Sequence, residues 1–209
     1  MEFGSGSGSS KEKEFYLETE PGVFVAMELS RGKLHSDSWQ KAPPTHLFCL
    51  DRPVTGDWSE HPMFEGHDWN YPVETFAINL RDSGLSKTKN WRFYGADSWI
   101  AYLLGNSYLA MRTWDLIAVA RALKAESDGQ RAIHLHAHDE FVPVALHAAA
   151  LEPELFESVT LHGGIRSWEE VIDSRDPIPQ LHNVVHGALR HYDLLDLVDL
   201  IGEEKVIWK

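Results

Sequence analysis

The stretch from Ile133 to Leu151 constrains the fold of this chain more than any other, and it reads IHLHAHDEFVPVALHAAAL. It has the pattern of a buried strand, a tight turn and an apolar helix. Polar and bulky residues, Asp139 to Phe141, occupy the turn where small residues would be expected. Together with the preceding strand and helix, this order is that of a βαβ unit in a parallel sheet. The stretch therefore predicts the centre of an α/β domain.

The rest of the chain supplies the other elements of such a domain. Helical spacing of apolar residues over 97–126, interrupted at Gly105, predicts a long broken helix, and a further helix is expected from Ser167 to Asp173. Short apolar runs between turn formers predict strands within Glu14 to Ser30, His46 to Leu50, Val73 to Leu80, Glu157 to Leu161 and Lys205 to Lys209. We expect an α/β fold with a mostly parallel sheet and helices on both faces.

The length of 209 residues fits one domain preceded by a short tail. Residues 1–10, MEFGSGSGSS, have the composition of a Gly/Ser linker or tag, which leaves residues 11–209 as the domain.

The charge and cysteine content exclude several classes of partner and site. The formal net charge is −13, which disfavours nucleic acid and anionic membranes as partners. The sequence has no run of about 18 apolar residues and no signal-peptide pattern, so we expect a soluble protein without a membrane partner. Cys49 is the single cysteine, which excludes an internal disulfide and a thiolate metal cluster.

Three segments carry a resemblance to a known family. After the strand ending at Leu80, Arg81, Gly84 and Ser86 match a D-x-R-G-x-G-x-S turn, while Asn79 and Asp82 depart from it. The second segment holds Leu103-Leu104-Gly105 followed by Met111-Arg112-Thr113-Trp114-Asp115, and the third holds Gly187, Leu189, Tyr192, Asp193, Leu194, Asp196 and Leu197. These segments resemble the bacterial acetyl xylan esterase-like branch of the α/β-hydrolases.

The resemblance implies hydrolysis of a carboxylic ester, with a small-molecule or carbohydrate ester as substrate and no cofactor. It places Asp139 at the nucleophile position of a sharp turn between strand and helix, with His138 beside it as a candidate catalytic residue. The backbone N–H of Glu140 would serve the oxyanion hole. The triad acid would be Asp193 or Asp196, although both also fit a helix cap or an acidic outer helix face.

The turn departs from the family pattern in a way that bears on activity. A carboxylate can act as a covalent nucleophile, so Asp139 is chemically admissible. The nucleophile turn needs small residues two positions before and after the nucleophile, and Ala137 meets this requirement whereas Phe141 does not. No histidine follows the candidate acids in the sequence, as the usual order of a triad requires, so we expect either a fragment or a reduced domain without a complete triad. The prediction is a hydrolase-family protein, or pseudoenzyme, with weak or lost activity.

Two further functions are compatible with the sequence. His134, His136 and His138 alternate along one strand and so share a face, which resembles the histidine pairs of metal sites; they can equally be hydrogen-bonded residues of an altered strand. Alternatively, an exposed sheet edge could make the chain a non-catalytic interaction domain or a homo-oligomer.

Overall fold

The computed structural model describes residues 4–5, 12–31, 44–51, 53–54, 74–87, 96–175 and 180–209, and every structural statement below concerns these ranges. Its strands are β1 (Gly4–Ser5), β2 (Glu12–Glu20), β3 (Val23–Arg31), β4 (Thr45–Cys49), β5 (Glu74–Asn79), β6 (Ile133–His138), β7 (Ser158–His162) and β8 (Val206–Trp208). Its α-helices are α1 (Ala96–Leu103), α2 (Tyr108–Ala125), α3 (Val142–Leu151), α4 (Trp168–Asp173) and α5 (Leu194–Ile201).

All strands join one sheet in the order β1-β2-β3-β5-β4-β6-β7-β8. Strands β5, β4, β6, β7 and β8 run parallel to one another, whereas β1, β2 and β3 pair antiparallel at one side. The predicted mostly parallel sheet is therefore confirmed. Two residues of the expected linker, Gly4 and Ser5, form β1, which pairs with β2 at the edge of the sheet.

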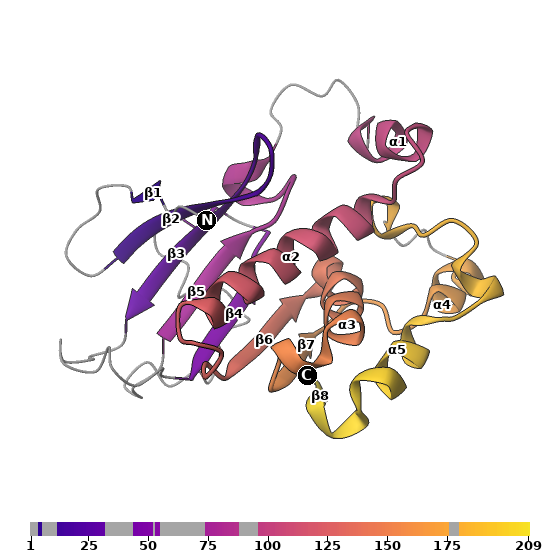
Figure 1. Ribbon diagram of the computed structural model, residues 1–209. Helices are drawn as coiled ribbons and strands as arrows, with labels where there is room; N and C mark the ends of the chain where they lie inside the picture. The colour runs from indigo at the N-terminus through magenta and orange to yellow at the C-terminus, as the bar shows by residue number, and fades with distance from the viewer. Residues whose placement is uncertain are drawn as a thin grey trace.

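One face of the sheet carries the main hydrophobic core. Ile133, Leu135 and Ala137 of β6 are fully buried there, in the same cluster as the apolar side chains of α2 and α3. Helices α2, α3 and α5 lie together along this face (Figure 1). The described helices that pack on the sheet do so on this side, so the expected covering of the second face is not tested within the described residues.

The predicted break in the long helix is present between α1 and α2. Gly105 has a φ of 76°, which suits glycine, and the backbone turns there before α2 begins. The Ser107 hydroxyl accepts a hydrogen bond from the Ala110 N–H at 3.4 Å and so caps the first turn of α2. The sequence pattern predicts the interruption at these same residues.

Candidate functional site

The sharp turn predicted between β6 and α3 is present at Asp139. This residue has a φ of 43°, a left-handed backbone conformation that is uncommon for a residue other than glycine. The chain continues through a 3-10 turn, Asp139–Phe141, directly into α3. Asp139 therefore lies at the carboxyl end of β6, between β4 and β7, where ligands bind in open parallel sheets.

Both carboxylate oxygens of Asp139 have a partner. Oδ1 accepts a hydrogen bond from the backbone N–H of Gly164 at 3.1 Å, and Oδ2 lies 3.0 Å from Nδ1 of His138. The side chain is nevertheless 63% exposed, so it can reach a molecule in solution. The structure thus brings two predicted site residues, His138 and Asp139, into direct contact.

Phe141 does not prevent the turn from forming, although its size departs from the family pattern. Its ring is buried against the guanidinium of Arg112, whose central carbon lies 5.2 Å from the ring centroid. The close approach to the turn is made instead by the next loop: a Cβ on Gly164 would lie 2.7 Å from the Asp139 carbonyl oxygen. Glycines after β7 thus provide the space that a small residue at position 141 would otherwise provide.

Arg112 connects two of the segments that carry the family resemblance. It is fully buried, and its Nε donates to the Arg81 carbonyl at 3.0 Å. Arg81 in turn forms a bidentate pair with Asp115, with distances of 2.7 and 2.6 Å. The matched residues after β5 and in α2 therefore hold each other in place behind the turn.

Glu140, the predicted oxyanion-hole residue, follows Asp139 in the first turn before α3. Its carbonyl accepts a hydrogen bond from the Asn183 side-chain amide at 2.8 Å, and its carboxylate lies 3.7 Å from Nη1 of Arg112. These contacts fix the residue, while its oxyanion role stays a prediction.

The two candidate triad acids lie at the start of α5. Asp193 accepts hydrogen bonds from the Ser167 hydroxyl at 2.5 Å, the Trp168 N–H at 2.8 Å and the Leu194 N–H at 2.7 Å. Partial burial raises the pKa of the Asp193 carboxyl, but these hydrogen bonds lower it by more. The pKa therefore lies below its ordinary value. Asp196 accepts from the Asp193 N–H at 2.7 Å, which completes a capping box. Within the described residues, no hydrogen bond or ion pair joins either acid to Asp139.

The three histidines of β6 share one face of the sheet, as predicted. Nε2 of His136 lies 2.8 Å from Nδ1 of His46 on the adjacent strand, and the rings of His46 and His134 stack with centroids 5.1 Å apart. Nδ1 of His134 lies 2.8 Å from the Ser158 hydroxyl. Burial lowers the pKa of His134, which favours the neutral ring. These contacts hold the rings by side-chain hydrogen bonds and stacking.

A cluster of side chains that the sequence pattern does not identify lies near the carboxyl edge of the sheet, the edge at which Asp139 also lies. Asp82, Asp97 and His182 come from three separate segments, and their ligand atoms lie within 4.8 Å of one another. In the sequence, Asp82 stands out only as a departure from the family pattern. No local spacing connects the three residues, so only the folded chain reveals the cluster.

No known protein family and no curated protein matches the sequence. Among solved structures, the chain is similar to a cold-adapted esterase from an Arctic intertidal metagenomic library, with 15% identity, a TM-score of 0.52, and coverage of 78% of this chain and 65% of the esterase. It also matches Est1E from Butyrivibrio proteoclasticus, with 16% identity, a TM-score of 0.47 and coverage of 72% of this chain. The chain spans about half of Est1E, 51% of its length.

At this level of identity the likeness concerns the fold. Within the residues that the structure describes, no helix is both long and apolar enough to cross a membrane. The chain has the α/β-hydrolase fold.

Proposed function

We propose that the chain is a carboxylic-ester hydrolase-family protein whose ester-hydrolysing activity is weak or lost. The observation that carries this proposal is the state of Asp139: it lies in the sharp turn after β6, with a φ of 43°, while Gly164 and His138 engage its two carboxylate oxygens. The proposed substrate class is a small-molecule or carbohydrate ester.

The chemistry of Asp139 supports reduced rather than full activity. Donors to both oxygens stabilise the charged carboxylate and withdraw electron density from the atom that would attack the ester. Nucleophilic catalysis also needs a histidine held by an acid. The two candidate acids, Asp193 and Asp196, have their carboxylates engaged in helix capping.

Hydrolysis of p-nitrophenyl acetate tests this proposal, with Asp139→Asn as the matched variant. Asparagine keeps the size of the side chain and can still accept from the Gly164 N–H, but it cannot act as a carboxylate nucleophile. We expect the wild-type chain and Asp139→Asn to hydrolyse the ester at the same rate. A clear turnover that depends on Asp139 would overturn the proposed loss of activity.

A metal-binding function is a second candidate, because β6 presents His134, His136 and His138 on one face beside His46. Imidazole nitrogens are common ligands of zinc and other transition metals. Elemental analysis of protein purified without a His tag tests this candidate. Less than about a tenth of an equivalent of metal after equilibration with zinc would exclude it.

An interaction function is a third candidate, supported by the position of β8. Within the described sheet this strand lies at the edge and pairs only with β7, and Ile207 is 46% exposed. Exposed edges can pair with a strand of another chain, including a second copy. Light scattering that shows a monomer over a wide concentration range would exclude assembly through this edge.

A further inference from the structure

Asp82, Asp97 and His182 converge from parts of the chain that are distant in sequence. Asp82 lies in the turn after β5, Asp97 in the first turn of α1, and His182 in the 3-10 turn Leu181–Asn183. Within the described residues, this is the one group of at least three His, Cys, Asp or Glu side chains whose ligand atoms all lie within 4.8 Å of one another. Carboxylate oxygens with an imidazole nitrogen form a ligand set suited to zinc.

The spacing inside the cluster fits shared coordination of an ion. Nε2 of His182 lies 3.5 Å from Oδ2 of Asp82 and 3.4 Å from Oδ1 of Asp97. Charge-assisted hydrogen bonds between nitrogen and a carboxylate are usually shorter, about 2.7 to 2.9 Å. Ligands held about 2.0 to 2.2 Å from one tetrahedral ion are separated from each other by about 3.3 to 3.6 Å. Both observed separations, 3.5 and 3.4 Å, fall in the range for two ligands of one tetrahedral ion.

The cluster is largely removed from water. The side chains of Asp82, Asp97 and His182 are 13%, 12% and 9% exposed. Removing two neighbouring carboxylates from water costs free energy unless a positive charge compensates them. A divalent cation at this position would balance the charge of the two carboxylates.

Asp82 is held in a backbone conformation that a side chain seldom adopts. Its φ is 56°, in the left-handed region that residues other than glycine rarely adopt. Arg112 donates to the Asp82 carbonyl, with Nη2 at 3.4 Å, and so fixes the peptide that carries the carboxylate. Backbone strain that the surrounding structure maintains is found most often at functional sites, which favours a functional role for the Asp82 side chain.

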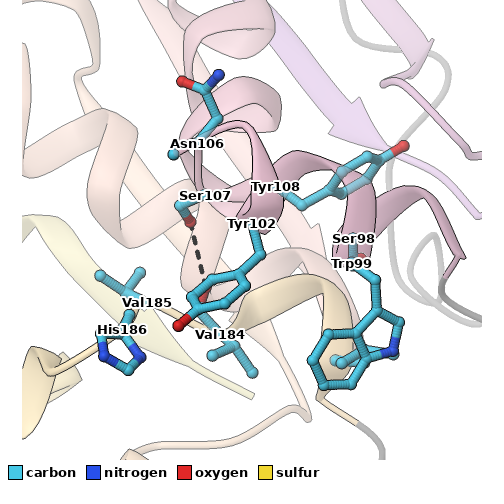
Figure 2. Close-up of a pocket in the computed structure, with 11 residues that line it drawn as sticks. Ser98, Trp99, Tyr102, Asn106, Ser107, Tyr108, Val184, Val185 and His186 are labelled. Atoms are coloured by element: carbon cyan, nitrogen blue, oxygen red, sulfur yellow. Dashed lines mark hydrogen bonds between the residues drawn. The ribbon is translucent and has the colours of Figure 1, made fainter.

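A pocket of about 630 Å³ adjoins the cluster. Its lining includes Ser98, which follows Asp97, and Leu181, which precedes His182. Tyr108 also lines the pocket, and its ring centroid lies 5.1 Å from that of His182. Figure 2 shows Tyr102 beside His186 in the lining of this pocket, and their ring centroids lie 5.5 Å apart. The Ser107 hydroxyl donates to the Val184 carbonyl at 3.2 Å. An ion at the cluster would therefore lie next to a space that admits a small molecule.

We propose that Asp82, Asp97 and His182 bind one divalent cation of the zinc class beside this pocket. Three protein ligands leave a coordination position for water or for an oxygen of a bound molecule, as in zinc sites of enzymes. This site uses none of the residues of the β6 histidine face and does not depend on Asp139.

Calorimetric titration of metal-stripped, untagged protein with zinc chloride tests the proposal. We expect one equivalent to bind, and Asp97→Asn to lower the affinity at least about tenfold, because asparagine supplies a neutral and weaker ligand. Asp199→Asn, which changes an exposed acid, is the control and is expected to bind zinc like the wild type. The double variant His134→Gln with His136→Gln reports whether zinc binds at the β6 histidines instead. Absence of binding at micromolar zinc, unchanged binding in Asp97→Asn, or loss of binding in the double variant would each overturn the proposal.

A measurement on the wild-type chain keeps the proposal testable if Asp97→Asn fails to fold. Exchange of the histidine C2 hydrogen for deuterium, followed peptide by peptide by mass spectrometry, slows when the ring binds a metal. Zinc is expected to slow this exchange at His182 and leave it unchanged at His134 and His136. Slowing at the β6 histidines without slowing at His182 would contradict the proposed site.

Discussion

Gly164 and Asp139 are in closer contact than any side chain at position 164 would allow. The glycine has a φ of 75°, its N–H binds the Asp139 carboxylate, and a Cβ there would lie 2.7 Å from the Asp139 carbonyl oxygen and 2.8 Å from Cγ2 of Val142. The turn that displays Asp139 therefore depends on a residue of the following loop.

Substitution of Gly164 by alanine is expected to destabilise the chain for two separate reasons. The left-handed backbone costs about 1 to 2 kcal/mol for a residue with a Cβ, and the clash with Asp139 and Val142 adds at least about 1 kcal/mol. Urea unfolding followed by circular dichroism measures the loss.

Gly187→Ala separates these two contributions. Gly187 has a φ of 76°, and a Cβ at this position would meet no atom of the described residues within 4 Å, its chain neighbours aside. The variant is expected to lose only the backbone part, about 1 to 2 kcal/mol. If Gly164→Ala and Gly187→Ala lowered the free energy of unfolding equally, the close approach to Asp139 would not contribute to the destabilisation in Gly164→Ala.

Single residues differ in how far the sequence can predict their role. The position of Asp139 follows from the strand, turn and helix pattern around it, which is local information. The tolerance of Phe141 depends on Gly164 and Arg112, which lie 23 residues after it and 29 before it in the sequence. Convergence of Asp82, Asp97 and His182 depends on three segments meeting in space, so no spacing in the sequence could have predicted it.

Between elements, Asp193 joins the start of α4 to the start of α5. Its carboxylate accepts from Trp168 in α4 and from Leu194 in α5. Asp193→Ala is expected to lower the free energy of unfolding by about 1 to 2 kcal/mol, because donors at both helix starts lose their acceptor. Chemical denaturation measures this change.

Asp199→Ala is the matched control on α5. Asp199 is exposed near the carboxyl end of the helix, where a negative charge is unfavourable, so its removal is expected to leave stability unchanged or slightly higher. If Asp193→Ala and Asp199→Ala behaved alike, the capping role of Asp193 would be contradicted.

His147 connects α3 to the segment before α5. Its Nδ1 donates to the Pro143 carbonyl at 2.6 Å, and its Nε2 accepts from the Tyr192 hydroxyl at 2.8 Å. Burial lowers the pKa of His147 below the ordinary value of 6.5, an effect that the Pro143 carbonyl only partly offsets. The folded state therefore keeps this ring neutral in mildly acidic solution.

The lowered pKa of His147 predicts how stability changes with pH. Below about pH 6.5 the unfolded chain binds a proton that the folded chain does not, so the free energy of unfolding falls as the pH decreases from about 7 to about 5. His134, whose pKa burial also lowers, contributes in the same direction. Denaturation at a series of pH values should show a shallower decline in His147→Gln and an unchanged decline in His191→Gln, at an exposed histidine. An unchanged decline in His147→Gln would refute the assignment.

For the whole molecule, local pattern predicts most of the architecture. The strands at β4, β5, β6 and β7, the broken helix at Gly105 and the helix after Asp139 are predicted close to their observed positions, because apolar periodicity and turn residues act locally. Sheet order and the contact between Arg81 and Asp115 do not follow from periodicity, since they pair residues far apart in the chain. Only the resemblance to the α/β-hydrolases indicates how these distant segments are arranged.

The candidate site at Asp139 is likewise predictable from the sequence only in part. Its place at the carboxyl end of β6 is predicted from the sequence, whereas the partners that occupy the Asp139 carboxylate, Gly164 and His138, are visible only in the folded chain. These partners are the basis for proposing that the fold has kept the nucleophile turn while its ester chemistry is weak or lost.

Rapid mixing of the chain with excess p-nitrophenyl acetate tests that claim most directly, because transfer of the acetyl group to Asp139 would release p-nitrophenolate before any hydrolysis of the acyl intermediate. We expect no initial burst of absorbance in the wild-type chain beyond that of Asp139→Asn. A burst approaching one equivalent of p-nitrophenolate, present in the wild type and absent in Asp139→Asn, would contradict the proposed loss of ester chemistry.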